Sequence, residues 1–468
     1  MKKMDATGSG KINKVDKVPL LGKTAYSFTG LAYQLTATMV GAYVVYFFTN
    51  VAHMNLGAVG TLMLLARICS ALGAPLAGIF IDNTNTRWGK ARPWYLWMTI
   101  PVSLVTVLLF IVPNFASAAA NMAYIWAFYI IWSLLEIFID TPTTAILPML
   151  TSNKDERTLL NSLRNGGSQI GGLIANAAVL PLVAVLGGHN DKKGFLLTAA
   201  LMASLSVLCY IFVFSGLREK NNVQVEAEPT TKKPKLSMAE SFKAIKGNWP
   251  WVLVFIITIL NFIANMARNT GVIYYFQYSL HDRTMTALAN GLNTTQLITI
   301  ALLPIFVKKI GQTNTWILGT VMSAFAQVMI LFSGQNITLV LVWWVVSNLG
   351  MGFSVPLIFA VIAETVDFGE WKSGVNAPGL LSGVGATTAN KFGGGLGAAL
   401  VPWVLAGFGY SATAVNQSAH ALTGINVAFI WIPAVVYLLS VIPMIFYKKY
   451  EKMGPTIKKE LKERRANN

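Results

Sequence analysis

The chain has 468 residues, of which 54% are hydrophobic and 12% charged, and its formal net charge is +17. A soluble domain cannot bury so many long apolar runs, so the composition excludes a soluble protein and predicts one that spans a membrane. Lys and Arg gather between the apolar runs and at the two ends, a pattern of membrane topology and anionic lipid rather than of nucleic-acid binding. Cys69 and Cys209 lie in separate apolar segments and indicate neither a disulfide framework nor a metal site.

Residues 1–22 are polar and basic and lack the apolar core of a secretory signal, so we expect a cytoplasmic tail. Twelve apolar windows follow, each near the roughly 20 residues that cross about 30 Å of hydrocarbon as a helix. The first six lie at 24–50, 57–81, 94–113, 121–150, 163–187 and 194–216, and the second six at 250–279, 287–307, 314–333, 338–366, 379–407 and 424–447. The sequence therefore predicts an all-α membrane protein with twelve transmembrane helices.

A polar, charged segment separates the two groups of windows. We expect two six-helix bundles at 23–216 and 249–447, joined by a cytoplasmic linker at 217–248 with one amphipathic helix near 236–247. Basic loops alternate with loops that lack Lys and Arg, and "GGHNDKKG" and "HDRT" depart mildly from this alternation. The positive-inside rule then places both termini, including a tail at 448–468, in the cytoplasm. Secondary transporters whose halves rock about a central site have this architecture.

Two carboxylates, Glu136 and Asp140, stand one helical turn apart in the apolar stretch "IWSLLEIFIDTPTTAILP". A charge in hydrocarbon is costly, so these residues indicate a function and a buried partner. Two alternatives stay open: a proton shared by the pair, or neutralisation by Arg67, Arg164 or Lys391 from neighbouring helices. A titrating pair favours H⁺ coupling, whereas a permanently bridged pair favours a structural or sugar-binding role.

Two other patterns concern the packing and movement of helices. The basic loop in "IFIDNTNTRWGKARPW" brings together Asp82, Arg87 and Arg92, whose charges can pair with helix ends of the opposite half and close one face of a rocking transporter. A solvated loop that follows the positive-inside rule is the alternative.

The Gly-rich stretches "GGSQIGG" and "KFGGGLGAAL" lie in apolar windows and predict close helix packing rather than phosphate binding.

Three motifs in order carry a resemblance to a known family: the loop at 79–94, "DERTLLNSLRN" at 155–165 and "AETVDFGEWKSG" at 363–374. Over nearly the whole chain, the sequence resembles the glycoside–pentoside–hexuronide:cation symporter family, the melibiose-permease-like branch of the major facilitator superfamily. Members take up sugars or sugar acids, usually with Na⁺, Li⁺ or H⁺. The resemblance implies the major facilitator fold and a sugar carrier.

The resemblance also implies roles for individual residues. Asp140 matches the helix-four carboxylate that binds sugar near the cation site, Arg164 a helix-five arginine near the sugar, and Lys391 a helix-eleven lysine near the cavity. Carboxylates accept from pairs of sugar hydroxyls, while Arg and Lys donate to hydroxyl and ring oxygens. Glu364 and Asp367 match a gate of the second half, with ordinary charge pairs at a solvated helix end as the alternative.

The chain departs from the family in the second window, where members show an Arg and two Asp residues that form the Na⁺ site. Here "ARICSALGAP" keeps Arg67 but has Ser70 and Ala74 where the carboxylates are expected. Hydroxyl and backbone oxygens alone bind Na⁺ weakly. The acidic sugar ligand of the first window is also absent, and Lys23 and Thr24 stand there as candidate substrate contacts.

Because the expected aspartates are missing, Glu136 is the leading candidate for ion coupling, with Asp140, Arg67 and Ser70 around it. We expect H⁺ rather than Na⁺ coupling, and uncoupled or exchange transport is the alternative. The predicted protein is a multi-pass transporter of the cytoplasmic (inner) membrane that imports a glycoside, pentoside or oligosaccharide. Membrane lipid surrounds it, and we expect no cofactor, metal site, nucleic acid or obligatory protein partner.

Two other interpretations stay open. A hexuronide or glucuronide carrier is one, because an anionic substrate would suit a site with several cations and few acids. Those cations are Lys23, Arg67, Arg164 and Lys391. A membrane-embedded enzyme that uses the two carboxylates as acid and base is the other, although neither a nucleophile with its base nor a metal cluster is visible in the sequence.

Overall fold

The structure is a computed structural model that describes residues 18–466 except 113, 116, 152, 189, 220–244, 375–380, 382–384 and 415. Every regular element in these ranges is a helix, and the β contact between Thr86 and Gly89 is an isolated bridge. Ten helical spans among the described residues are long and apolar enough to cross a membrane. The prediction of an all-α membrane protein is confirmed.

The N-terminal half, defined as residues 18–219, begins with α1 and the short π-helix η2 and ends with α7. Its helices cover the six predicted windows, although α3 is not among the ten spans. The elements are α1 (Leu20–Tyr46), η2 (Phe47–Val51), α2 (Leu56–Asp82), α3 (Arg92–Leu109), α4 (Ala118–Ala145), α5 (Leu147–Leu150), α6 (Lys154–Gly187) and α7 (Asp191–Gly216).

The C-terminal half, defined as residues 245–466, covers the other six windows, and α14 is not among the ten spans. The predicted linker helix near 236–247 lies mostly outside the described residues. The elements are α9 (Trp249–Tyr274), η3 (Tyr275–Ser279), α10 (Met285–Leu292), η4 (Asn293–Thr295), α11 (Gln296–Ile310), α12 (Gln312–Leu331), α13 (Ile337–Ser373), α14 (Gly385–Gly407), α15 (Ala419–Asn426), η6 (Val427–Trp431) and α16 (Ile432–Ala466).

Helices α13 and α16 are longer than a membrane requires. They have 37 and 35 residues, which is more than about 50 Å of helix against roughly 30 Å of hydrocarbon. The region 448–466, predicted as part of a tail, therefore continues α16 as a helix. Its buried side chains Tyr450, Ile457 and Leu461 pack in the same apolar cluster as Phe368 of α13. The two helices thus form a common projection from the C-terminal half.

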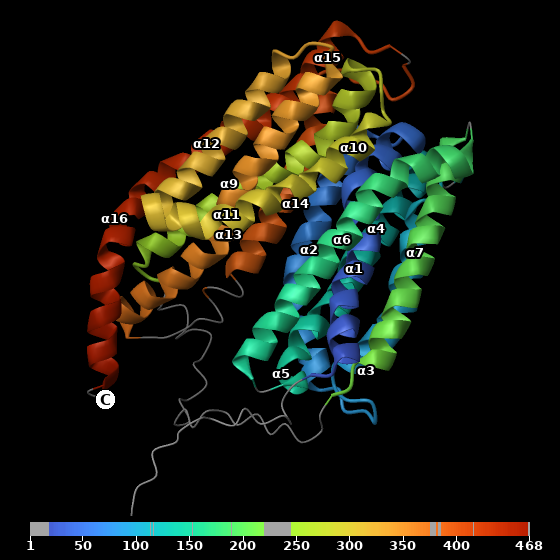
Figure 1. Cartoon of the computed structure of the whole chain (residues 1–468). Coiled ribbons are helices and arrows are strands. Elements are labelled where there is room, and N and C mark those ends of the chain that lie inside the picture. The colour runs from blue at the N-terminus through green and yellow to red at the C-terminus, as the bar shows by residue number, and fades with distance from the viewer. Residues whose placement is uncertain are drawn as a thin grey trace, which may run out of the picture.

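The two halves lie side by side (Figure 1). Their ribbons are close together at the upper end of the view and diverge toward the lower end, and α2 packs against α14 while α6 packs against α10. The start of α1 and the end of α16 both lie at the lower end. We call this the cytoplasmic end, following the positive-inside prediction, and the opposite end the outer end.

The Gly-rich stretches lie in helices and bring their backbones close to neighbouring helices, which confirms the packing prediction. A Cβ atom at Gly167 of α6 would lie 2.0 Å from the carbonyl oxygen of Ser27 in α1. A Cβ atom at Gly397 of α14 would lie 2.4 Å from the carbonyl oxygen of Ile263 in α9. These contacts leave no room for a side chain, so glycine sets the spacing of the helices.

The first helix of each half ends at the outer end in the same way. A π-helix closes each helix, η2 after α1 and η3 after α9. Two residues beyond each π-helix a histidine adopts positive φ: 52° at His53 and 55° at His281. The amides on either side of each histidine donate back to the start of the π-helix. The halves therefore present matching helix ends to each other.

Candidate functional site

Glu136 is buried in α4, with 5% of its surface exposed. The Tyr33 hydroxyl of α1 donates a hydrogen bond to its Oε1, and the Lys391 ammonium of α14 lies 3.8 Å from its Oε2. Arg67 of α2 is close enough to act on the same carboxylate electrostatically. Side chains from three neighbouring helices thus converge on one buried carboxylate, and two cations offset the cost of its charge.

The contact between Glu136 and Lys391 joins the two halves, because α4 belongs to the N-terminal half and α14 to the C-terminal half. Its 3.8 Å separation is too long for a hydrogen bond. In the described part of the chain, Oε2 of Glu136 has no hydrogen-bond partner. A proton on this oxygen would remove the charge that attracts Lys391, so protonation and the relative movement of the halves can be coupled.

Asp140 forms a separate ion pair one turn further along α4. Nη2 of Arg164, from α6, lies 2.6 Å from its Oδ1, so each carboxylate has a cation of its own. The Asp140 side chain is 43% exposed, whereas Nε of Arg164 is buried and has no hydrogen-bond partner within the described ranges. An accessible carboxylate beside an unused N–H donor suits a ligand that carries hydroxyl groups.

Arg67 and Ser70 lie one turn apart on α2, where this helix meets α14. A Cβ atom at Gly395 of α14 would lie 2.7 Å from Cβ of Arg67, so the glycine lets the two helices approach closely. Ser70 is buried, and its Oγ has no hydrogen-bond partner among the residues that the structure describes. The structure describes the backbone of Ala74 but not its side chain. This face of α2 brings a cation toward Glu136.

Lys23 and Thr24 lie near the cytoplasmic end of α1. The Lys23 ammonium is 2.9 Å from Oε1 of Glu156 in α6, and the Thr24 hydroxyl donates to two carbonyls of its own helix. Ten residues of helix separate Lys23 from Tyr33, which is about 15 Å along the axis. In this conformation, Lys23 and Thr24 are therefore separate from the group around Glu136.

The predicted gate residues of the N-terminal half lie in or beside the loop between α2 and α3. Arg92 donates from Nε to the carbonyl of Phe214 at 2.7 Å, and its guanidinium also lies over the Phe214 ring. Arg87 lies over the neighbouring indole ring, and the Glu219 carboxylate accepts from three successive amides of the loop. These partners all belong to the same half. The side chain of Asp82 lies outside the described residues.

The predicted gate residues of the second half lie in α13. The Tyr447 hydroxyl donates to Oε2 of Glu364 at 3.2 Å, and the Lys458 ammonium lies 3.6 Å from Oε1. Both partners come from α16 of the same half. Asp367, three residues further along α13, is half-buried. In this conformation Glu364 thus holds α16 against α13, and a gating role for these residues stays a prediction.

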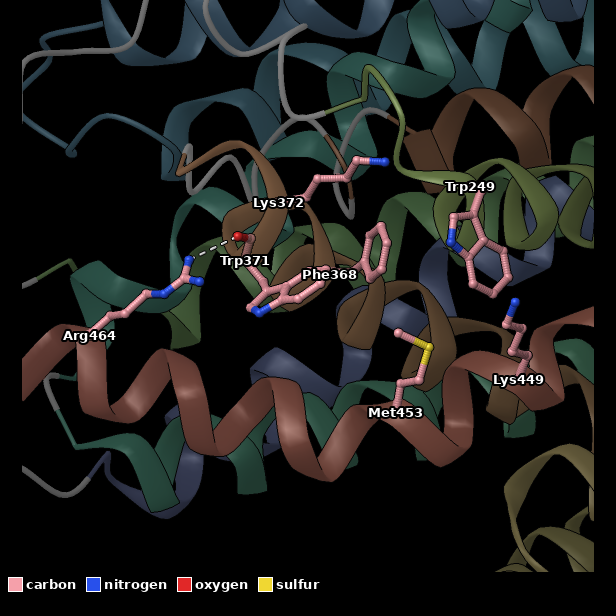
Figure 2. Close-up of a pocket in the computed structure, with 7 residues that line it drawn as sticks. All are labelled: Trp249, Phe368, Trp371, Lys372, Lys449, Met453 and Arg464. Carbon is pink, nitrogen blue, oxygen red and sulfur yellow. Dashed lines mark hydrogen bonds between the residues drawn. The ribbon is translucent and has the colours of Figure 1, made fainter.

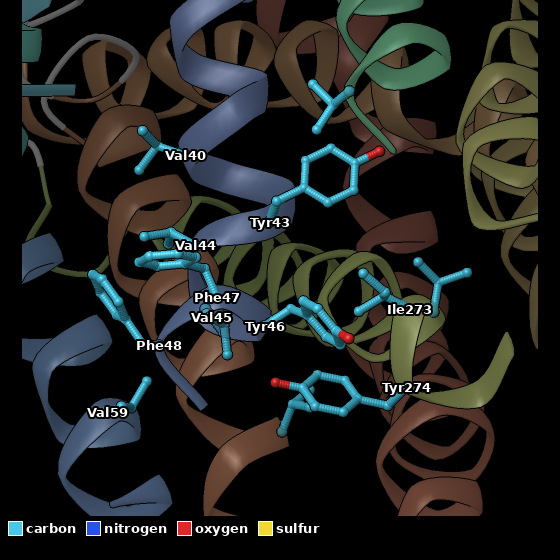
Figure 3. Close-up of a cluster of buried hydrophobic side chains, with 14 of the residues drawn as sticks. Val40, Tyr43, Val44, Val45, Tyr46, Phe47, Phe48, Val59, Ile273 and Tyr274 are labelled. Carbon is cyan, nitrogen blue, oxygen red and sulfur yellow. The ribbon is translucent and has the colours of Figure 1, made fainter. Parts of the chain in front are cut away.

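Polar contacts join the two halves at the outer end. The Thr49 and Tyr274 hydroxyls are 2.6 Å apart, and the Asn50 amide donates to the Tyr278 hydroxyl at 2.7 Å. Figure 3 shows Tyr46 next to Tyr274, with ring centroids 5.7 Å apart. The matching ends of α1 and α9 are thus held together by hydroxyl and amide groups within an aromatic layer.

An ion pair completes this outer contact. Arg283 donates to both oxygens of Asp191 at 2.5 and 3.0 Å and to the Tyr46 hydroxyl at 3.3 Å. We call Asp191, Arg283 and Tyr46 the outer latch. Burial disfavours the charge on Arg283, but its hydrogen bonds to Asp191 and Tyr46 outweigh burial and raise its pKa, so the guanidinium stays charged. Sequence reasoning missed this pair, although it lies in the two loops that depart from the positive-inside alternation.

Arg268 is a second residue that sequence reasoning missed. It is fully buried in α9, donates to Gln327 at 3.2 Å and Asn348 at 3.1 Å, and lies 3.5 Å from the centroid of the Trp344 ring. These neutral partners come from α12 and α13, so Arg268 ties three helices of the C-terminal half together. An arginine within an apolar window was the available signal.

The chain resembles known transporters along most of its length. Residues 25–450 match the family described as MFS/sugar transport protein. The isoprimeverose transporter of Lactiplantibacillus pentosus is 35% identical, covering 98% of this chain and 95% of the relative. The inner membrane symporter YicJ of Escherichia coli (strain K12) is 30% identical over 90% of each chain.

Solved structures share the fold at low sequence identity. The nucleoside transporter NupG has a TM-score of 0.67 at 15% identity, covering 92% of this chain and 100% of the solved one. A D-xylose-proton symporter has a TM-score of 0.62 at 14% identity, covering 91% of this chain and 95% of the solved one. Together with the helices described above, this likeness confirms the predicted major facilitator fold.

Proposed function

The chain belongs to the MFS/sugar transport family, in its glycoside–pentoside–hexuronide symporter branch, and from this premise we propose that it imports a neutral glycoside together with H⁺. It is a multi-pass membrane transporter rather than an enzyme, and its fold works by alternating access of a central site to the two sides of the membrane. We place it in the cytoplasmic membrane, with a small sugar as its ligand.

The observation that carries the proposal is the contact of Glu136 and Lys391 across the two halves, one turn from the Asp140–Arg164 pair. In our mechanism, sugar hydroxyls engage Asp140 and Arg164, whose accessible carboxylate and unused donor support such binding. A proton on Glu136 then releases Lys391 and lowers the barrier to rocking of the halves. Sugar binding at Asp140 and protonation of Glu136, one turn apart on α4, thus both favour the rocking of the two halves.

The pairing of the cations favours a neutral sugar over a hexuronide. Lys23 contacts Glu156, Arg164 contacts Asp140, and Lys391 contacts Glu136. Arg67 also acts on Glu136. A substrate carboxylate would have to displace a resident carboxylate from one of these cations, which costs an existing ion pair. Isoprimeverose, named for the relative at 35% identity, is therefore the first sugar to test.

Uptake into membrane vesicles tests this function. We expect labelled isoprimeverose to accumulate when a pH gradient is imposed, with little added effect of Na⁺, and unlabelled neutral glycosides to compete better than uronides. If only uronides competed, the substrate would be a hexuronide and the proposal of a neutral glycoside would be wrong. Strong Na⁺ stimulation without a response to the pH gradient would contradict H⁺ coupling, and exchange without accumulation would indicate an uncoupled carrier.

A further inference from the structure

A cavity of about 450 Å³ opens at the cytoplasmic end of the C-terminal half (Figure 2). It lies between α9, α13 and α16, and none of the residues grouped around Glu136 lines it. Its apolar walls come from the aromatic rings of Trp249, Phe368 and Trp371 and from the side chain of Met453. The cavity therefore belongs to the long projection of α13 and α16 rather than to the transport site.

The cavity lies where two membrane spans end, beside the last turns of α13. Helix α9 begins at Trp249, and the apolar part of α16 ends shortly before Lys449, which lines the same cavity. Tryptophan is enriched where hydrocarbon gives way to headgroups, because its ring is apolar and its N–H is polar. The cavity walls are thus placed at the level of the lipid headgroups on the cytoplasmic side.

The charged lining residues are all cations: Lys372, Lys449 and Arg464. Lys372 and Lys449 are exposed, and Lys372 donates one hydrogen bond, to the carbonyl of Gly247 at 3.1 Å. Arg464 is more occupied, since it donates to the Trp371 carbonyl at 3.0 Å and lies 4.0 Å from Glu460. The two lysines therefore offer most of the capacity to bind an anion.

We propose that this cavity binds the phosphate headgroup of an anionic phospholipid from the cytoplasmic leaflet. Lys372 and Lys449 contact the phosphate, while Trp249 and Phe368 pack against the glycerol and the first carbons of the acyl chains. A free phosphate ion would leave these aromatic walls uncovered, whereas a lipid satisfies the cations and the apolar surface together. Attraction of anionic lipid to basic side chains at this level is a general property of membrane proteins.

Native mass spectrometry of the purified full-length transporter, titrated with phosphatidylglycerol or phosphatidylcholine, tests the proposal. We expect preferential binding of phosphatidylglycerol. In the double variant Lys372→Gln with Lys449→Gln, we expect its affinity to fall roughly thirty-fold, because each lysine near the surface contributes to lipid attraction. The matched control is Lys459→Gln with Lys462→Gln, which removes the same charge from exposed positions of α16 that do not line the cavity. The affinity of this control variant for phosphatidylglycerol should change less than threefold.

Three results would overturn the assignment. Equal losses in the two double variants would indicate general charge attraction, and unchanged binding in the first would place the lipid elsewhere. Displacement of the lipid by an equal concentration of inorganic phosphate would indicate a site for free anions. If the double variant does not fold, Lys449→Gln alone gives the same comparison against Lys459→Gln, with a smaller expected loss of about fivefold.

Discussion

Glu136 is the residue on which proton coupling is expected to depend, because its Oε2 is an unused acceptor beside a cation from the other half. Glu136→Gln keeps the size of the side chain and an acceptor for Tyr33 but removes the group that takes up a proton. We expect a pH gradient to drive no accumulation in this variant, while exchange of labelled for unlabelled sugar stays within about threefold of the parent rate. Vesicle uptake and counterflow measure the two quantities.

Glu156→Gln is the matched control for this substitution. Glu156 is also buried and also contacts a lysine, Lys23, but it lies near the start of α6. We expect this variant to keep proton-driven accumulation. Unchanged accumulation in Glu136→Gln, or an equal loss in both variants, would remove Glu136 from the coupling step.

At the scale of elements, the packing of α14 requires glycine where this helix contacts α9, but not on the face of α14 that has no close neighbour. A Cβ atom at Gly397 would lie 2.4 Å from a backbone carbonyl of α9, whereas one at Gly394 would meet nothing within 4 Å. We expect Gly397→Ala to destabilise the protein by about 1–3 kcal/mol through overpacking. Gly394→Ala should stabilise it by about 0.5–1 kcal/mol, since alanine favours a helix. Thermal unfolding of the two purified variants compares them directly, and a lower midpoint for Gly394→Ala would contradict this account.

The sequence could predict the helices because apolar windows report membrane spans directly, but it could not predict how far α13 and α16 continue. Their last turns pack on each other: the Trp371 indole N–H donates to Glu460 at 2.7 Å, and Arg464 donates to the Trp371 carbonyl at 3.0 Å. Such pairing depends on the tertiary arrangement and leaves no periodic apolar signal in a charged segment. The sequence therefore predicted a polar tail at 448–468 but not that residues 448–466 continue α16.

At the scale of the whole molecule, the sequence indicated which charges matter but not how they pair. Residue type and helical spacing were enough to single out Glu136 and Asp140. Sequence reasoning also offered Arg67, Arg164 and Lys391 as the neutralising cations. It could not assign a cation to each carboxylate, because Arg164 and Lys391 come from helices of different halves. The outer latch was missed for a related reason: Asp191 begins α7 and Arg283 lies in the loop before α10, and only the arrangement of the halves brings these two positions together.

The outer latch holds one state of the molecule, so breaking it should shift the balance between conformations. The Asp191 and Arg283 side chains are 41% and 24% exposed, and solvent screening limits the pair to about 1 kcal/mol. In Asp191→Asn, we therefore expect the ratio of outer-open to outer-closed molecules to rise about fivefold. Spin labels at the exposed positions Ala119 and Ser411, on opposite halves at the outer end, report this change as a longer distance. Cys69→Ala and Cys209→Ala provide the background for labelling.

Two further variants decide whether the pairing itself is responsible. Exchanging the charges, with Asp191→Arg and Arg283→Asp together, should restore much of the shorter distance, because the ion pair forms again in the reverse sense. Asp282→Asn removes a neighbouring charge that accepts hydrogen bonds from Thr284 in its own loop, and it should leave the distances unchanged. If Asp191→Asn and Asp282→Asn gave the same distribution of distances, the latch would have no part in closing the outer end. The other outer contacts, those of Thr49 with Tyr274 and of Asn50 with Tyr278, would then account for its closure.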